Sequence, residues 1–154
     1  TLIDPYCLKL FHQRWYLLGK SETKGGKLGI YALDRMTELT ETAVQYELAA
    51  NFDAETYFKN SFGVFVGEEA PAQHIVLRAY GNMPNLLHTL PLHHSQKEIC
   101  KTDTYTDFEY YLAPTFDFQQ AILKEGNELE ALEPESLRKT IHDELTKALK
   151  RYKK

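Results

Sequence analysis

The sequence predicts an α+β protein made of two small modules in tandem. Three features of the chain predict it. Residues 14–36 hold two aromatic-rich segments separated by a glycine-containing turn. Strand and helix patterns then follow one another as β-α-β-β-α-β between residues 73 and 132, and an amphipathic helix follows Pro134.

A hairpin is predicted at the centre of the first module. The segments 14–19 and 30–36 are rich in aromatic and β-branched residues, which favour strands. The polar segment 21–27 between them contains Gly25 and Gly26, and glycine takes positive φ without a steric penalty. The two strands are therefore expected to pair through a loose turn.

Two-residue periodicity assigns the faces of the first of these strands. Trp15 and Leu17 point to one face, and Tyr16 and Leu18 point to the other. Both faces are apolar, so we expect one of them to lie under the neighbouring module. We expect Trp15 to be a core residue.

Further short strands are expected on both sides of this hairpin. Residues 6–11 are predicted to form a strand that reaches the next one through a tight turn at His12 and Gln13. Residues 36–39 and 44–48 are predicted to be strands that close the module.

A connecting segment is predicted between the modules. Asp53 is a suitable N-cap for a short helix at residues 54–59, and an extended apolar path follows at 61–67. The charged stretch 68–72 contains Pro71 and marks the boundary. The predicted domains are residues 1–51, the connecting helix and linker 52–71, and residues 72–154.

The second module shows the clearest alternation of strands and helices. The predicted strands are residues 74–80, 97–101, 105–112 and 127–132, and the predicted helices are residues 83–90 and the segment between Thr115 and Gly126. Ile75, Leu77 and Ala79 share one face of the first strand. The order of elements is that of the ferredoxin-like split arrangement.

The last helix is predicted to start at Pro134 and to bury one side. Its apolar stripe consists of Leu137, Ile141, Leu145, Ala148 and Leu149. Basic residues dominate its end: Lys147, Lys150, Arg151, Lys153 and Lys154. These charges suit the negative end of a helix dipole, and contact with nucleic acid is the alternative.

Composition limits the class of protein. The chain has 154 residues, of which 43% are hydrophobic, enough for one ordinary core or two small ones. No stretch approaches the length of a membrane span and no leader opens the chain, so we expect a cytoplasmic protein without membrane contact. Cys7 and Cys100 are expected to be reduced packing residues, because two distant cysteines make neither a disulfide framework nor a zinc cluster.

The charge distribution restricts any nucleic-acid contact to a small area. The net charge is -4, which disfavours broad binding of duplex DNA. Residues 1–51 carry six basic and six acidic side chains, so the deficit lies downstream. A nucleic-acid site would have to be a focused pocket.

The polar clusters of the second module favour structural roles. The turn His93-His94-Ser95-Gln96 invites comparison with a metal site or a hydrolase, but neither ligand spacing nor a nucleophile context accompanies it. We expect its side chains to cap backbone groups. Asp103, Asp107 and Glu109 are read as exposed charges that blunt a strand edge. Gly25-Gly26 is no phosphate loop, so no enzyme, metal or cofactor is predicted.

A series of motifs carries a family resemblance. They are Pro5-Tyr6-x-Leu8, Arg14-Trp15-Tyr16-Leu17 and Tyr31-Ala32-Leu33-Asp34-Arg35-Met36, in this order. Together they resemble the WYL domain of bacterial transcriptional regulators. The segments 53–67, 92–96 and 132–138 resemble the C-terminal extension, called WCX, that usually follows it. The resemblance covers nearly the whole chain.

The resemblance implies a fold and a role. It implies a small Sm-like or SH3-like β-barrel that senses a nucleotide or single-stranded nucleic acid, followed by the ferredoxin-like module. It also implies a homodimer and a DNA-binding helix-turn-helix that this chain lacks. The chain begins without methionine and without the strands that normally precede the Pro-Tyr motif, so we expect a piece of a longer regulator with an incomplete barrel.

The candidate ligand site combines basic and aromatic side chains. Arginine presents a planar fork suited to phosphates, and tyrosine rings stack on bases. The candidate ligand-binding residues are Tyr6, Arg14, Tyr16, Lys27, Tyr31 and Arg35. We expect Arg14 and Arg35, at the ends of adjacent strands, to converge on one anion. The alternative is that the arginines pair with nearby acids.

One position departs from the family pattern. Family members usually carry an arginine where this chain has Gly29, and Lys27 is the nearest base. We therefore keep a second hypothesis beside ligand sensing, in which the chain is a structural and oligomerisation module without a ligand of its own.

Overall fold

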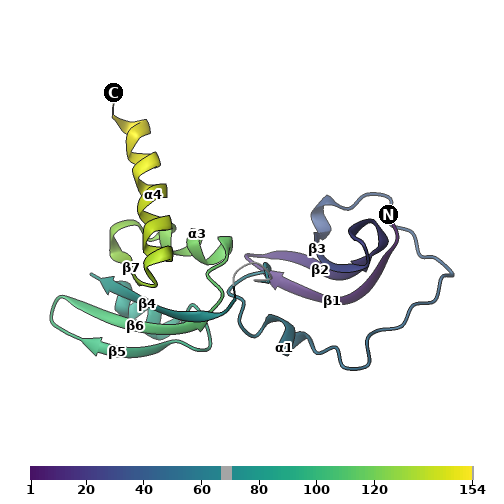
Figure 1. The fold of residues 1–154 in the computed structure, drawn as a ribbon, viewed down its shortest axis with the longest axis horizontal. Coiled ribbons are helices and arrows are strands. Elements are labelled where there is room, and N and C mark those ends of the chain that lie inside the picture. Colours follow the sequence, from purple (N-terminus) through teal and green to yellow (C-terminus); the bar gives the residue numbers. More distant parts are fainter. Residues whose placement is uncertain (67–70, 154) are drawn as a thin grey trace. The chain divides into compact units, whose positions relative to one another are not determined.

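The computed structural model describes residues 1–66 and 71–153, which form two compact units (Figure 1). The first unit is Thr1–Lys59 and the second is Asn60–Lys154. The predicted domain limits at residues 51 and 71 stay a prediction. The charged linker predicted at 68–72 falls mainly outside the described residues.

The first unit contains one antiparallel sheet. Its strands β1 (Ile3–Phe11), β2 (Arg14–Ser21) and β3 (Lys27–Ala32) pair in chain order. The tight turn between β1 and β2 is confirmed, since His12 and Gln13 have φ of 47° and 62°. The hairpin between β2 and β3 is confirmed too. A 3-10 turn, Glu22–Lys24, leads there into two glycines with φ of 64° and 73°.

The two closing strands predicted at 36–39 and 44–48 are wrong. The structure describes residues 36–53 throughout and shows neither strand there. Glu38 has a φ of 54°, which breaks an extended path. Leu39 and Val44 remain 76% and 60% exposed, so no packed surface holds this segment as a strand. The sheet therefore stays open, and no closed barrel is formed by the described residues.

One face of the first sheet packs against the segment that follows. The Lys9 ammonium lies 3.8 Å from the centre of the Phe58 ring. Phe58 ends helix α1 (Ala54–Phe58), whose predicted N-cap is confirmed because Asp53 Oδ2 accepts a hydrogen bond of 2.7 Å from the Thr56 N–H. Hydrogen bonds from Thr56 lower the pKa of the Asp53 carboxyl. Lys9 is paired with Tyr16, so the Tyr16 face is the covered one.

The prediction that Trp15 is a core residue is wrong. Trp15 lies opposite Leu10 in the register, and Leu8 lies opposite Leu17 on the same face. Trp15, Leu10 and Leu8 are 51%, 55% and 57% exposed. The reason is the side on which α1 packs. Lys9 and Phe58 contact each other on the Tyr16 face of the sheet. The opposite face, which carries Trp15, is therefore not covered by α1.

The second unit contains a four-stranded antiparallel sheet. Its strands are β4 (Gln73–Tyr80), β5 (Lys97–Lys101), β6 (Tyr105–Leu112) and β7 (Leu129–Glu133), in the spatial order β5-β6-β4-β7. Helix α2 (Met83–Thr89) follows β4, and α3 (Phe116–Lys124) with a 3-10 turn (Gly126–Glu128) precedes β7. The observed order is compatible with the predicted ferredoxin-like arrangement.

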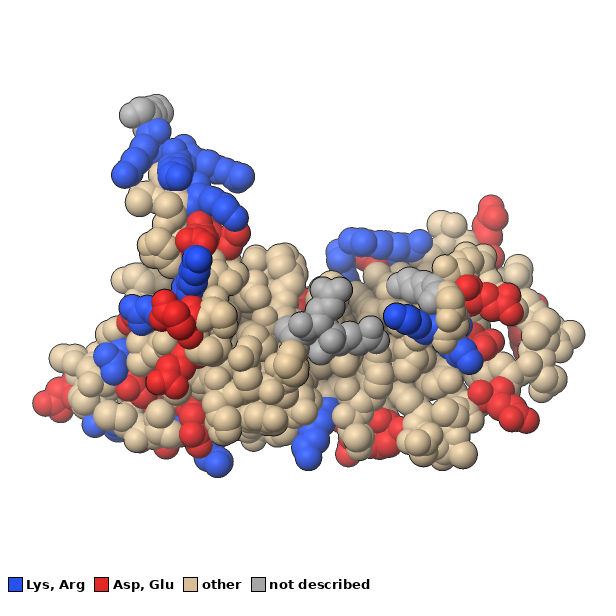
Figure 2. Space-filling view, viewed as in Figure 1, with Lys and Arg blue, Asp and Glu red and all other residues tan. Residues whose placement is uncertain are grey.

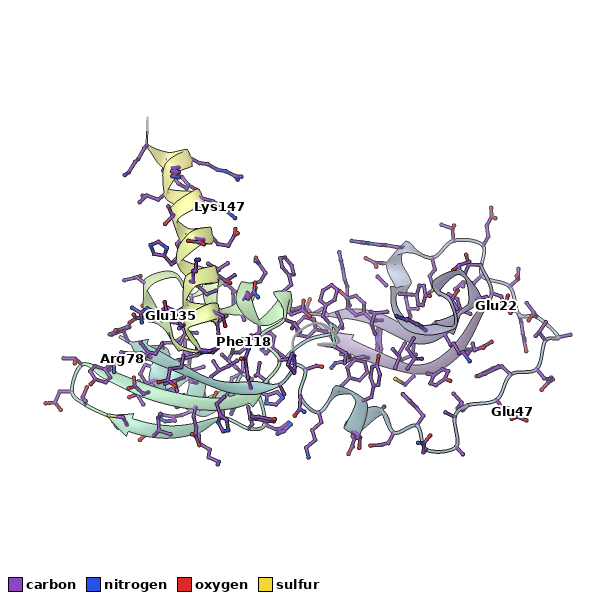
Figure 3. All side chains as sticks on the ribbon, viewed as in Figure 1. Glu22, Glu47, Arg78, Phe118, Glu135 and Lys147 are labelled. Carbon is purple, nitrogen blue, oxygen red and sulfur yellow. The ribbon has the colours of Figure 1, made fainter. Side chains whose placement is uncertain are left out.

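The core of the second unit lies between its helices and one face of the sheet. Ile75, Leu77 and Ala79 on β4 are fully buried, as periodicity predicted. Phe118 of α3, labelled in Figure 3, is also fully buried. Its ring packs against that of Phe62, with 5.5 Å between the centroids. Alternating strand residues therefore define this core correctly.

The segment just before β4 belongs to the second unit. Ser61 forms an isolated bridge with Ala113 at the end of β6. The Asp117 carboxylate accepts hydrogen bonds of 2.9 and 3.3 Å from the backbone N–H groups of Val64 and Phe65. A side chain at Gly63 would overlap this carboxylate, so the close approach requires glycine.

Helix α4 (Glu135–Tyr152) closes the chain and follows Pro134, its N-cap. Leu137 and Ile141 are 3% and 6% exposed, which confirms the predicted apolar face in its first half. Leu145 and Leu149 on the same face are 45% and 55% exposed. Within residues 1–66 and 71–153, no helix combines the length and apolar character that crossing a membrane requires.

Candidate functional site

Two arginines and one carboxylate gather at one end of the first sheet. Strand β3 ends at Ala32, directly opposite Tyr16. The chain then enters a 3-10 turn, Leu33–Arg35, which lies beside the start of β2. Arg14 Nε lies 3.2 Å from Asp34 Oδ2 within this end of the sheet. The side chains of this pair are 52% and 47% exposed, so solvent and ligands reach both.

The predicted position of Arg35 on a strand is wrong. Arg35 is the last residue of the 3-10 turn, because β3 stops three residues earlier. The turn nevertheless keeps Arg35 in the segment that supplies Asp34 to Arg14. Arg14, Arg35 and Asp34 together carry a formal charge of +1. The Asp34 carboxylate therefore neutralises one of the two positive charges that the arginines supply.

The register divides the other candidate residues between the two faces. Tyr16 lies opposite Ala32, while its neighbour Leu17 lies opposite Tyr31. Adjacent positions on a strand point to opposite faces, so Tyr16 and Tyr31 are on different sides of the sheet. Lys27 shares the Tyr31 face and lies at the far end of β3, roughly 17 Å from Ala32 at about 3.4 Å per residue.

Tyr6 lies apart from the arginine end as well. It falls where the β1–β2 register shifts between Pro5 and Cys7, which marks a bulge. Its ring packs edge-on against Phe52, with 4.9 Å between the centroids. The six predicted residues therefore do not line one pocket. Arg14 and Arg35 share one end of the sheet, and Tyr16 shares the face of Arg14.

A cavity of about 750 Å³ lies elsewhere in the first unit. It opens between the first half of β1, Leu17 and the segment 36–46. The carboxylates of Asp4, Glu38 and Glu41 line it, and none of the described lining residues is a lysine or arginine. A phosphate would be repelled there. The arginine end of the sheet is therefore the better candidate for an anion.

Gly29 lies on the opposite face of the sheet from Arg14. It lies opposite Gly19, and β3 periodicity places position 29 on the face of Lys27 and Tyr31. A longer side chain at Gly19 would run into Ile3. An arginine at position 29 would thus point away from the face of Arg14, so the glycine leaves the Arg14 end unchanged.

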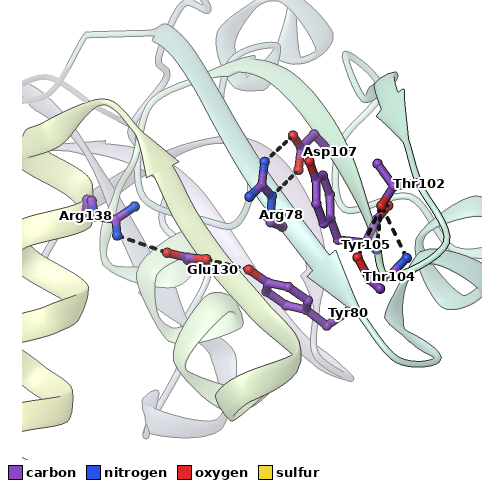
Figure 4. A network of polar contacts seen from close by, with 8 residues as sticks. All are labelled: Arg78, Tyr80, Thr102, Thr104, Tyr105, Asp107, Glu130 and Arg138. Carbon is purple, nitrogen blue, oxygen red and sulfur yellow. Dashed lines mark hydrogen bonds and ion pairs between the residues drawn. The ribbon is translucent and has the colours of Figure 1, made fainter.

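A polar network that the sequence did not predict crosses the sheet of the second unit (Figure 4). Arg78 donates two hydrogen bonds to Asp107, Nε to Oδ1 at 2.8 Å and Nη2 to Oδ2 at 2.9 Å. The Arg78 guanidinium also lies 3.7 Å from the centre of the Tyr105 ring. Glu130 accepts from the Tyr80 hydroxyl at 2.8 Å and pairs with Arg138 at 3.0 Å.

The interpretation of Asp107 as an exposed edge charge is wrong. Strand β6 is central in the sheet, and Asp107 is 7% exposed. The carboxylate raises the pKa of Arg78 by accepting its hydrogen bonds. The pKa of Tyr80 is raised in turn by its hydrogen bond to Glu130. Each charge of this network has a partner on a neighbouring element, which fits a structural role better than a binding site.

The His93–Gln96 turn caps backbone groups, as predicted. Gln96 Nε2 donates to the Leu87 carbonyl at 2.8 Å, and Gln96 Oε1 accepts from the Leu92 N–H and the Tyr110 hydroxyl at 3.0 Å each. Ser95 Oγ accepts from the Tyr111 N–H at 2.9 Å. Burial raises the pKa of Tyr110. These contacts fasten the end of α2 to β6.

No metal-binding group is found in the described part of the chain. Within residues 1–66 and 71–153, no three His, Cys, Asp or Glu side chains come together as a metal site would need. Cys7 and Cys100 are free thiols. Burial raises the pKa of Cys7 more than the nearby Lys9 lowers it.

The chain is an α+β protein whose first unit carries two exposed arginines, Arg14 and Arg35, at one end of its sheet. The family model of the WYL domain matches residues 1–41. This segment holds β1 to β3 and the Arg14–Asp34 pair, and the predicted resemblance to the WYL domain is confirmed for it.

One solved structure resembles the chain over most of its length. It is proteasome accessory factor B/C of Arthrobacter aurescens, at 16% sequence identity and a TM-score of 0.37. The match covers 90% of this chain and 21% of that one, so the chain spans about a fifth of that protein's length. No curated protein matches the chain.

Proposed function

We propose that this chain is the ligand-sensing and dimer-forming part of a bacterial transcriptional regulator. The observation that carries the proposal is the WYL domain at residues 1–41 with two exposed arginines at one end of its sheet. In this proposal, residues 72–154 are the WCX extension with a ferredoxin-like fold, and a DNA-binding domain lies outside this sequence. The role is non-enzymatic and the protein acts in the cytoplasm.

The proposed ligand is a nucleotide or a single-stranded nucleic acid. Its phosphate would bind the guanidinium groups of Arg14 and Arg35, which suit bidentate contacts. Tyr16, on the face of Arg14, is half-buried because α1 packs on this face, so a base would stack on the part of the ring that stays exposed. Tyr6, Lys27 and Tyr31 contribute less, because the sheet places them on other parts of its surface.

The signal would begin at Asp34. A bound phosphate competes with this carboxylate for Arg14, and Asp34 lies in the turn that leads into the irregular segment 36–53. Release of the ion pair changes the path of this segment. A ligand that binds one arrangement better than the other shifts the population toward it, and the rest of the regulator responds to that shift.

Substitution of both arginines tests the proposal. We expect labelled single-stranded DNA or RNA to bind the wild-type chain in a salt-sensitive manner, with affinity falling as salt rises. The Arg14→Ala/Arg35→Ala variant should bind at least about tenfold more weakly. The negative slope of the logarithm of the binding constant against the logarithm of the salt concentration should become shallower by about 1.4, which is about 0.7 for each of two lost phosphate contacts. Fluorescence anisotropy across a salt series measures both quantities.

The matched control is Lys20→Ala, which removes an exposed positive charge from the same strand at the other end of the sheet. This variant should bind like the wild type. Equal weakening by both substitutions would show general charge attraction and would reject a site at Arg14 and Arg35.

A structural and oligomerisation module is the second candidate. The Arg14–Asp34 ion pair and the acidic lining of the cavity in the first unit favour it. The two candidates differ in the same titration. A purely structural module binds neither oligonucleotide nor nucleotide at low salt.

A further inference from the structure

One face of α4 changes from buried to exposed along its length. Leu137 and Ile141 belong to the core of the second unit. The same stripe continues through Leu145, Leu149 and Tyr152, which are 45%, 55% and 86% exposed. At 3.6 residues per turn these positions lie on one side of the helix. The apolar stripe therefore runs beyond the part of the unit that covers it.

The second half of α4 lacks the support that keeps short helices folded. Residues 142–152 are exposed apart from Thr146, which is half-buried, and Figure 1 shows this end of α4 standing clear of its own sheet. This half of α4 continues an 18-residue helix without packing of its own apolar face, and most helical stability in proteins comes from such packing. An apolar stripe in this position is typical of a helix that packs against a partner.

A groove lies beside the start of the exposed stripe. It has a volume of about 320 Å³ and lies between α4 and the edge strand β7. Ile141 and Leu145 line it from the helix, and Leu129 and Ala131 line it from the strand side. Glu130, Arg138 and His142 also line the groove, so apolar and charged side chains share it, and it is large enough for one aromatic side chain.

Charges on α4 select the direction in which a second helix can lie. Figure 2 shows basic side chains gathered at the free end of α4, where Lys147, Lys150 and Arg151 are exposed. Two copies in parallel would bring these charges together. In an antiparallel pair, Glu144 and Arg151 lie on the same flank of the stripe, and each comes within two residues of the level of the other residue in the second copy. Glu144 also pairs with Lys147 of its own helix at 2.6 Å, so Arg151 of the second copy competes with this pair.

We propose that α4 is a dimerisation helix and that its partner is the α4 of a second copy of this chain. With Ala148 facing Leu145 of the second copy, Tyr152 lies level with its Ile141 and enters the groove between α4 and β7. Two Glu144–Arg151 pairs flank this contact. This arrangement rests on the dimer-forming part of the proposed function and specifies its interface. Ligand binding at Arg14 is measured in a separate experiment, so the α4 interface and the ligand site can each fail without the other.

Charge reversal tests the antiparallel contact in the full chain. Sedimentation equilibrium from about 1 to 100 μM should show a reversible dimer for the wild type. Glu144→Arg or Arg151→Glu alone should weaken dimerisation several-fold, and the double variant Glu144→Arg/Arg151→Glu should restore it. Leu149→Glu should raise the dimer dissociation constant at least about tenfold.

The control is Leu90→Glu, which places the same charge on another exposed leucine, 78% exposed at the end of α2. It should dimerise like the wild type, and far-UV circular dichroism should show that each variant is folded. A wild type that stays monomeric, a double variant no tighter than the single ones, or a dimer unchanged by Leu149→Glu would each overturn the proposal.

Discussion

Phe118→Ala is expected to lower the free energy of unfolding of the second unit by about 3–5 kcal/mol. Phe118 is fully buried in the core between α3 and the sheet. Its ring packs against Phe62 and Tyr110, at 5.5 and 6.0 Å between centroids. Truncation leaves a cavity lined by these two aromatic rings. Urea unfolding followed by far-UV circular dichroism measures the loss.

Two controls accompany this measurement. Phe116→Ala makes the same change two residues earlier on α3, at a side chain that is 61% exposed, and should cost far less. Trp15, the one tryptophan of the chain, lies in the first unit, so its fluorescence transition should not move. Equal losses for Phe116→Ala and Phe118→Ala would contradict the observed orientation of α3.

Gln96→Ala is expected to lower the same free energy by about 2–3 kcal/mol, because hydrogen-bonding groups left without partners in a folded protein are costly. The substitution removes the amide that joins Leu87, Leu92 and Tyr110. These partners lie on α2, on the turn after it and on β6, so the loss loosens the packing of α2 on the sheet. Chemical denaturation of the variant gives the difference directly.

Gln120→Ala is the matched control for Gln96→Ala. Gln120 is an exposed residue of α3, so the same change should alter stability by less than about 0.5 kcal/mol. Hydrogen exchange adds a local measure, since the amides of α2 should lose protection in Gln96→Ala alone. A Gln96→Ala protein as stable as the control would show that this turn does not hold α2.

The strands, helices and core of the second unit could largely be predicted from the sequence pattern. Phe108, Tyr110 and Leu112 alternate with polar neighbours, and a central strand buries one such face whatever else surrounds it. The Arg78–Asp107 pair was not predictable in the same way. The two residues are neighbours only because β6 pairs with β4, and local periodicity does not contain that pairing.

The first unit shows where local pattern stops being sufficient. Tryptophan is common in protein cores, but the burial of Trp15 depends on which face of the sheet α1 covers. That choice is made by tertiary packing and cannot be read from the local sequence. The segments 36–39 and 44–48 have strand-like residues but no packed surface or ladder in the structure. Strand propensity alone does not form a strand without them.

The candidate site was predictable in its chemistry but not in its geometry. Motif order indicated Arg14 and Arg35, and both lie at one end of the first sheet. The opposite faces of Tyr16 and Tyr31 follow from a cross-strand register that the sequence does not state. The ion pair with Asp34 depends on a 3-10 turn where a continued strand was expected.

The affinity of the Asp34→Asn variant for a labelled single-stranded oligonucleotide tests the central claim most directly. This nearly isosteric substitution removes the carboxylate charge that occupies Arg14 and leaves both arginines in place. If an anion binds there, the variant should bind about two- to fivefold more tightly than the wild type, as expected for loss of one exposed competing charge. Unchanged or weaker binding would contradict a ligand site at Arg14.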